Sequence, residues 1–183
     1  MDLAQEIERV RREAREIYSA ADVRAALDAV AARIAADLAA KNPLVVAVMQ
    51  GGVFAAVRLC ERFGFPHEFE YVHATRYRAD LRGGDLEWIV GPKASYRERV
   101  VLVVDDVLDR GVTLSAVRAE LTRLPVAELY TAVLVSKACG DARARPAVDY
   151  VALHAGRDYL FGCGMDYKGY WRNLMSIYAV DPS

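Results

Sequence analysis

The stretch VVLVVDDVLDRGVTL, residues 100–114, joins an aliphatic run to a group of carboxylates. Residues 100–104 are all aliphatic, as in a strand that is buried on both faces of a parallel sheet. Asp105, Asp106 and Asp109 follow within five positions, and three negative charges so close together repel one another. Stability alone does not explain them, so we expect a binding role where this strand ends.

The residues after the acids are typical of a turn that binds an anion. Gly111 permits a tight backbone turn, and Thr113 stands just before the next predicted helix, where its hydroxyl can cap the helix. Backbone N–H groups at such a helix N-terminus attract anions. Carboxylates that can accept hydrogen bonds from sugar hydroxyls, or lie beside a metal ion, complete a site that suits a sugar phosphate. A solvated acidic turn that only caps a helix is the simpler alternative.

A second known chemistry uses the D-D-x-x-D spacing on a long helix. In prenyl diphosphate synthases these acids hold Mg²⁺ to a diphosphate. Five aliphatic residues before the acids and Gly111 after them disfavour a helix here, and the chain is short and rich in predicted strands.

Strand and helix patterns alternate along the rest of the chain without an internal repeat. The apolar spacing predicts helices over residues 3–17, 19–41, 53–64 and 114–124, and strands over 44–49, 68–74, 87–90, 100–104, 129–135 and 149–155, with a polar loop over 75–86. This order predicts an α/β fold, a mainly parallel sheet flanked by helices. We expect one domain over 1–183, divided into N-terminal helices (1–42), a core (43–155) and a small C-terminal hood (156–183).

Composition excludes several classes of protein. The 183 residues are 54% hydrophobic and 27% charged, with a net charge of −1, which is a globular balance and does not indicate a nucleic-acid partner. The arginines of RVRREAR, residues 9–15, alternate with acids and apolar positions, as on a solvated helix face. No apolar stretch is long enough to span a membrane. The charged N-terminus and three scattered cysteines favour a cytoplasmic protein with reduced thiols.

Three segments together resemble a known enzyme family. Residues 100–114 resemble the phosphoribosyl pyrophosphate-binding motif of the type I phosphoribosyltransferases. VLVSKA (133–138) and DYLFGCGMDYKGYWRNL (158–174) resemble the hypoxanthine-guanine branch, and the likeness runs from about Leu44 to Val180. It implies the fold of that family and a Mg²⁺-dependent transfer of the phosphoribosyl group to N9 of hypoxanthine or guanine, in purine salvage. It also implies a homodimer or homotetramer.

The resemblance implies roles for the residues around the acidic cluster. Asp105 and Asp106 match the pair that binds the ribose hydroxyls, and Asp109 matches the catalytic general acid/base near purine N7. The turn that matches the 5′-phosphate cradle comprises Asp109, Arg110, Gly111, Val112 and Thr113. Arg110 stands where a small hydroxyl residue is usual, and Asp105 where glutamate is common.

Further matches lie outside that cluster. Lys137 matches a lysine that contacts the purine 6-oxo group, while Tyr159 matches the ring stacked on the base and Leu160 the backbone that reads its edge. Asp166 matches an acid that lies near Mg²⁺, the base and pyrophosphate, and Arg172 matches an arginine that contacts pyrophosphate. Gln50 and Gly51 match a pyrophosphate-binding turn that often has a cis peptide. Arg76 and Tyr77 match a mobile loop.

Two other functions remain open at the level of the sequence. A phosphoribosyltransferase that prefers xanthine or a pyrimidine would differ only in the base pocket. A non-catalytic nucleotide sensor on the same fold would need a basic face for nucleic acid, which the charge of −1 does not provide.

Overall fold

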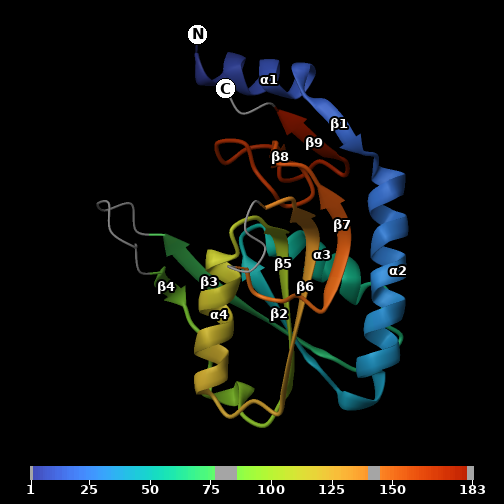
Figure 1. The fold of residues 1–183 in the computed structure, drawn as a ribbon, viewed down its shortest axis with the longest axis vertical. Coiled ribbons are helices and arrows are strands. Elements are labelled where there is room, and N and C mark those ends of the chain that lie inside the picture. The colour runs from blue at the N-terminus through green and yellow to red at the C-terminus, as the bar shows by residue number, and fades with distance from the viewer. Residues whose placement is uncertain (1, 77–85, 140–144, 181–183) are drawn as a thin grey trace.

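The centre of the protein is a six-stranded sheet. The computed structural model describes residues 2–76, 86–139 and 145–180, and the strand order is β4-β3-β2-β5-β6-β7. The bounds are β2 (Leu44–Met49), β3 (Glu68–Arg76), β4 (Leu86–Val90), β5 (Val100–Leu108), β6 (Glu128–Lys137) and β7 (Tyr150–Ala155). Every neighbouring pair is parallel except β3 and β4. The predicted α/β fold with a mainly parallel sheet is confirmed (Figure 1).

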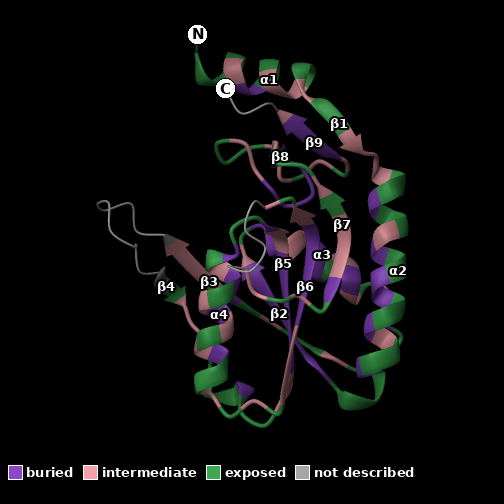
Figure 2. Ribbon diagram, in the orientation of Figure 1, coloured by how far each residue is buried: buried purple, intermediate pink, exposed green. Residues whose placement is uncertain are grey.

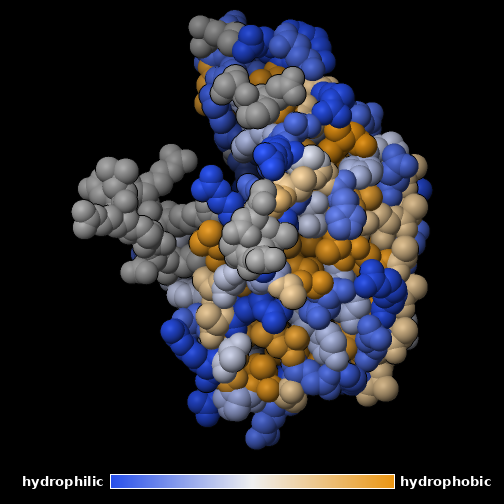
Figure 3. Space-filling model, viewed as in Figure 1, coloured by the Kyte–Doolittle hydropathy of each residue, from blue (hydrophilic) through white to orange (hydrophobic). Residues whose placement is uncertain are grey.

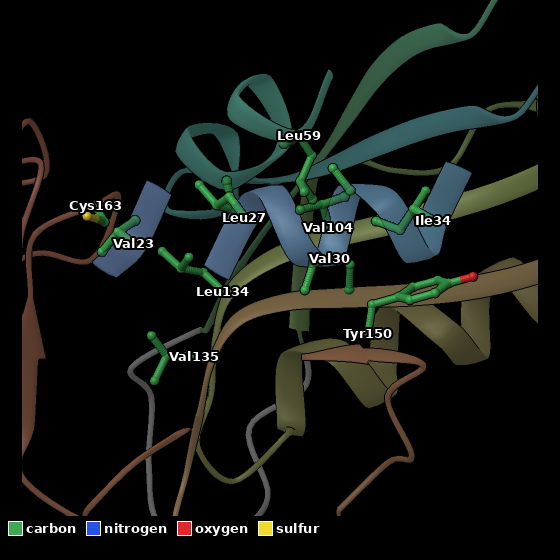
Figure 4. Close-up of a cluster of buried hydrophobic side chains, with 14 of the residues drawn as sticks. Val23, Leu27, Val30, Ile34, Leu59, Val104, Leu134, Val135, Tyr150 and Cys163 are labelled. Carbon is green, nitrogen blue, oxygen red and sulfur yellow. The ribbon is translucent and has the colours of Figure 1, made fainter. Parts of the chain in front are cut away.

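Helices cover both faces of the central part of this sheet, which explains why β2 and residues 100–104 of β5 are apolar throughout. Val45 and Val104 pack with α2 (Ala20–Leu38) and α3 (Gly52–Cys60), as Figure 4 shows for Val104 among residues of α2 and α3. The alternate residues Val46 and Val103 pack with α4 (Val112–Arg123) on the opposite face. Burial is therefore concentrated in the central strands and in the helix faces turned toward them (Figure 2). Short 3-10 turns lie at η1 (Ala39–Lys41) and η2 (Ala94–Tyr96).

A second, three-stranded sheet forms above the carboxyl ends of the core strands. It contains β1 (Arg15–Tyr18), β9 (Ile177–Val180) and β8 (Tyr159–Phe161), paired antiparallel in the order β1-β9-β8. The helix α1 (Leu3–Glu13) lies across it (Figure 1). Because α1 and β1 join residues 156–180 in this structure, we use the name hood from here on for all three segments. The two ends of the described chain therefore build one structure.

The prediction of a single helix over residues 3–17 is wrong. The helix ends at Glu13, Ala14 is extended, and β1 follows. Arg15 and Glu16 pair with Ala179 and Tyr178 of β9, so the backbone gains ladder hydrogen bonds that a longer helix would forgo. The apolar spacing is real, but Ile17 packs against the main core from a strand rather than from a helix.

Several predicted boundaries of helices and strands also differ from those in the structure. β5 continues to Leu108, so Asp105 and Asp106 lie within the strand and not after it. Thr113 is not the helix cap, because α4 begins at Val112 and Gly111 takes the cap position. The helix predicted over 53–64 is α3 and ends at Cys60. The sequence patterns also did not predict β8 and β9, which are short strands of the hood.

The described helices include none that is long and apolar enough to cross a membrane. On the face drawn in Figure 3, hydrophobic residues are interspersed with hydrophilic ones rather than gathered in one band.

Candidate functional site

The site lies where the chain changes direction within the sheet. From β2 the chain passes to β3 on one side, and it later returns to β5 on the other side of β2. In open α/β sheets, such a switch leaves a crevice at the carboxyl ends of the two strands, where ligands bind. Here β2 ends at the Gln50–Gly51 turn, and β5 ends in the acidic cluster.

The paired acids are held by the backbone of their own strand. The Asp106 N–H donates to Asp105 Oδ1 at 2.9 Å, and the Val107 N–H donates to Asp106 Oδ1 at 2.7 Å. Asp105 is only 7% exposed, and Asp106 is half-buried. Burial, with the Asp106 charge as a second cause, raises the pKa of Asp105 well above its usual value. Burial also raises the pKa of Asp106, while Arg172 is among the groups that oppose that rise.

Glycines allow three backbone segments to meet beside these acids. A Cβ on Gly51 would lie 1.6 Å from Asp106 Oδ2, and one on Gly164 would lie 2.1 Å from the Gly51 carbonyl oxygen. Gly52 approaches the Val104 carbonyl in the same way, at 2.6 Å. The peptide bond between Met49 and Gln50 is cis, as the resemblance implied for this turn. The turn after β2 is therefore packed between β5 and the hood with no room for a side chain at Gly51 or Gly52.

The loop after β5 has the geometry of an anion-binding turn. Gly111 has φ 75°, a left-handed conformation that glycine adopts readily, and α4 begins directly after it. The first N–H groups of a helix lack partners within the helix. Val112 and Thr113 carry such groups, and both residues line the larger cavity described below. Arg110 also lines this cavity and is otherwise exposed.

Strand register brings Asp109 and Lys137 together. Leu108 of β5 pairs with Ser136 of β6, so the next residue of each strand lies at the same edge of the sheet. Lys137 Nζ is 3.8 Å from Asp109 Oδ2. The Lys137 side chain is only 12% exposed, whereas that of Asp109 is 58% exposed. The pair therefore places a positive and a negative group side by side in the wall of a cavity.

The hood contributes the opposite wall. Arg172 Nη2 pairs with Asp166 Oδ1 at 2.6 Å, and the Gly169 N–H donates to Asp166 Oδ2 at 2.6 Å. Arg172 also donates to the Gly164 carbonyl at 2.5 Å. The Tyr159 hydroxyl donates to the Asp166 carbonyl at 2.8 Å, which holds the tyrosine ring at the edge of the hood. These contacts hold the loop after β8 in place within the hood.

Two adjoining cavities result. The smaller, about 170 Å³, is lined by Asp106, Val107, Asp109, Lys137, Tyr159, Leu160, Met165 and Asp166. The larger, about 460 Å³, lies over the acidic strand end, the Gly51 turn and the loop 109–113, and Arg172 also lines it. Asp106, Val107, Asp109, Tyr159 and Asp166 line both cavities. A flat ring in the smaller space would therefore adjoin a polar group in the larger one.

Most of the residues singled out in the sequence meet at this site, but not all. Gln50 lines a separate groove of about 420 Å³ beside α3 instead. Arg76 is the last residue of β3, and Tyr77 lies outside the described residues, so the predicted mobile loop is not placed. No role at the site was predicted from the sequence for Met49, Val107, Gly164 or Met165. Only the glycine carried a signal, because the GCG triplet at 162–164 is typical of tight backbone contact.

The described residues contain no group of three or more histidine, cysteine or acidic side chains that could enclose a metal ion. The donors available to a cation at the site are the carboxylates of Asp105, Asp106, Asp109 and Asp166.

A family model described as "Phosphoribosyl transferase domain" matches residues 13–156, which include the whole core sheet. The chain belongs to this family. The match ends before β8, so α1 and the C-terminal part of the hood lie outside it. The match therefore includes the strand ends and the phosphate turn, but not residues 158–172 of the hood.

Individual relatives cover more of the chain. The hypoxanthine-guanine-xanthine phosphoribosyltransferase of Tritrichomonas foetus is 28% identical over 163 residues, 89% of this chain and 89% of that protein. The hypoxanthine-guanine phosphoribosyltransferase of Mycobacterium avium is 29% identical over 152 residues, 82% of this chain and 74% of that protein. A solved structure of a variant hypoxanthine phosphoribosyltransferase from Trypanosoma cruzi, in complex with IMP, has a TM-score of 0.80 and 25% identity and covers 93% of this chain and 92% of that one.

Proposed function

We propose that this protein transfers the phosphoribosyl group from phosphoribosyl pyrophosphate to N9 of hypoxanthine or guanine, which gives IMP or GMP and pyrophosphate. The observation that carries the proposal is the pair of adjoining cavities. The smaller is lined by the Lys137–Asp109 pair, and the larger combines strand-end carboxylates with an anion-binding turn. The relatives named above act on oxopurines by their descriptions, which supports the same assignment.

The larger cavity suits the phosphoribosyl group. Asp105 and Asp106 accept hydrogen bonds from the ribose 2′ and 3′ hydroxyls, and the turn 109–113 donates its backbone N–H groups to the 5′-phosphate. Arg172 and the Gly51 turn face the pyrophosphate. As pyrophosphate leaves the anomeric carbon, negative charge gathers on it, and a cationic side chain lowers the barrier by stabilising that charge.

The smaller cavity suits the purine. Tyr159 stacks on the ring, and the Leu160 backbone reads its edge. Lys137 donates to the 6-oxo group, which an oxopurine has and adenine lacks. Asp109 lies where it can exchange a proton with N7 while N9 attacks the sugar. Its carboxylate lines both cavities, as a group acting between base and sugar must.

Magnesium fits this donor set. Mg²⁺ keeps several waters and is usually held by one or two carboxylates together with substrate phosphates, so a cage of three protein ligands is not required. Asp166 is the carboxylate that we propose for the metal, with its Oδ1 already oriented by Arg172. When bound, the ion neutralises charge on the pyrophosphate.

The remaining expectations accompany this proposal. We propose a homodimer or homotetramer, as the family resemblance implies. A cytoplasmic location agrees with a highly charged phosphate ester as substrate. Neither nucleic acid nor a membrane is a proposed partner.

The proposal is tested by incubating the protein with phosphoribosyl pyrophosphate and Mg²⁺ and with hypoxanthine, guanine, xanthine, adenine or uracil in turn. Nucleotide formation is followed by chromatography. We expect IMP and GMP, and little product from adenine or uracil. A protein that forms neither IMP nor GMP contradicts the proposal. Product from xanthine or uracil alone indicates the other branches of the family, and binding of nucleotide without turnover indicates a sensor.

A further inference from the structure

Arg145 lies behind the purine side of the site and lines neither cavity. Its guanidinium donates three hydrogen bonds. Nη1 donates to the Lys137 carbonyl at 2.7 Å, and Nη2 donates to the Leu108 carbonyl at 2.8 Å and to Ser136 Oγ at 3.1 Å. All three acceptors are neutral oxygens at the carboxyl ends of β5 and β6. Arg145 therefore joins the two strand ends that carry Asp109 and Lys137.

The hydrogen bonds of Arg145 lie where the pairing of β5 with β6 ends. Leu108 and Ser136 are the last paired residues of the β5–β6 ladder. On its other side β6 continues one residue further, because Lys137 pairs with Ala155 of β7. Beyond Leu108, the backbone that leads into Asp109 has no such neighbouring strand. The guanidinium spans the end of the ladder and replaces the next pair of strand bonds.

The adjacent residue supports the phosphate turn. A Cβ on Gly111 would lie 2.5 Å from Cδ of Pro146, so the proline ring rests directly against the backbone of the turn. Residues 145 and 146 thus contact both the strand end before Asp109 and the glycine two residues after it. Because Asp109 lies between these two contacts, a shift of residues 145 and 146 would displace it.

We propose that Arg145 is a positioning residue that sets the spacing between Asp109 and Lys137, and hence how the purine is held between its 6-oxo and N7 contacts. The inference rests on the proposed function, since it assigns the base to this pair. The guanidinium suits the task because its planar fork donates to two carbonyls at once. An ammonium group on a flexible stem has no such fork and would leave the two strand ends less firmly joined.

Three variants test the inference. Arg145→Met keeps most of the length and removes all three hydrogen bonds, and Arg145→Lys keeps the charge without the fork. Arg118→Met is the matched control, because Arg118 also bridges β6 and the chain after residue 145, donating to Thr131 Oγ1 at 3.3 Å and to the Ala147 carbonyl at 3.5 Å. Thr131 lies in the middle of β6, away from the strand ends.

Initial rates give KM and kcat for hypoxanthine and for phosphoribosyl pyrophosphate. We expect Arg145→Met to raise the KM for hypoxanthine roughly tenfold or more and to lower kcat, because small displacements of contacting groups are costly. Arg145→Lys should lie between this variant and the wild type. The KM for phosphoribosyl pyrophosphate should change less than about threefold, and Arg118→Met should leave both KM values unchanged.

The KM for hypoxanthine is the decisive readout. If Arg145 had a merely structural role, its variants would contain less folded protein, but the folded molecules would bind hypoxanthine as the wild type does. The inference is overturned if both Arg145 variants have the wild-type KM for hypoxanthine. If Arg145→Met does not fold, a wild-type KM in Arg145→Lys alone overturns it. An equal rise of both KM values also overturns it, since the effect would then not be specific to the base. Failure of the wild type to form IMP or GMP overturns the proposed function itself.

Discussion

The Asp106 carboxylate occupies the space that a side chain on Gly51 would need: Oδ2 lies 1.6 Å from the position of a Cβ there. We predict that Gly51→Ala displaces this acid from the strand end. Because Asp106 borders both cavities, kcat/KM for phosphoribosyl pyrophosphate should fall roughly ten- to a hundredfold. The overpacking should also reduce the free energy of unfolding by about 1–3 kcal/mol. Steady-state kinetics and denaturant titration measure the two effects.

Gly64 provides the control for that substitution. A Cβ at Gly64 would meet nothing within 4 Å, so Gly64→Ala tests the general effect of replacing a glycine in this chain. We expect wild-type kinetics. Equal activity in the two alanine variants would show that the packing of Gly51 on Asp106 has no part in catalysis.

Asp109 should matter for turnover far more than for binding. Asp109→Asn keeps the shape and removes the basic carboxylate, and general acid–base catalysis contributes about 10²–10⁴-fold. We predict a loss of at least about a hundredfold in kcat, with the dissociation constant for IMP changed by less than about threefold. Presteady-state kinetics and isothermal titration calorimetry separate the two. Parallel losses in turnover and IMP binding would mark the aspartate as structural.

Lys137 should determine the affinity for oxopurines. Lys137→Met removes the donor that faces the 6-oxo group in the proposed complex, and the KM for hypoxanthine should rise roughly ten- to a hundredfold. Lys93→Met is the control, because Lys93 pairs with Glu70 on the surface of β3 and lies outside both cavities. Unchanged selectivity between hypoxanthine and adenine in Lys137→Met would contradict the assignment.

The burial of Asp105 predicts a pH-dependent cost in stability. Its pKa is raised in the folded protein, so the folded state holds this proton more tightly than the unfolded chain does. The free energy of unfolding therefore falls as the pH rises from the ordinary range of an aspartate through the raised pKa. Asp105→Asn removes this loss and can still accept the bond from the Asp106 N–H.

Thermal melts from pH 4 to pH 8 test this. The Tm difference between Asp105→Asn and the wild type should increase with pH, by about 2–4 °C for each kcal/mol gained in the free energy of unfolding. The activity of Asp105→Asn should be lower than that of the wild type. A Tm difference between Asp105→Asn and the wild type that stays constant from pH 4 to pH 8 would show that the Asp105 carboxyl ionises normally.

The core of the fold was predictable because its signals are local. Continuous aliphatic runs predict strands with helices on both faces, and such runs mark β2 and β5. The acidic cluster and Gly111 indicated the phosphoribosyl side of the site by the same kind of argument. Each of these features lies within fifteen consecutive residues, where spacing alone carries the information.

A hood was expected over residues 156–183, but its strands were not predictable, because they depend on partners far away in the sequence. β1 was expected to be the end of a helix, and only the presence of β9 makes it a strand. Arg145 gave no signal either, since an arginine in a polar segment normally faces solvent and its three acceptors come from two other strands. Propensity and periodicity do not encode such contacts.

The composition of the hood has a consequence for the synthesis of the chain. Arg11 donates to the Tyr178 hydroxyl at 2.9 Å, and these residues are 167 positions apart. During translation, α1 and β1 emerge first, whereas their partners in residues 154–180 leave the ribosome last. The strand ends and the phosphate turn can assemble earlier, so a nascent chain would be able to hold a sugar phosphate before it could enclose a purine. Premature release upstream of residue 177 would therefore yield a fragment without β9, the strand with which both β1 and β8 pair.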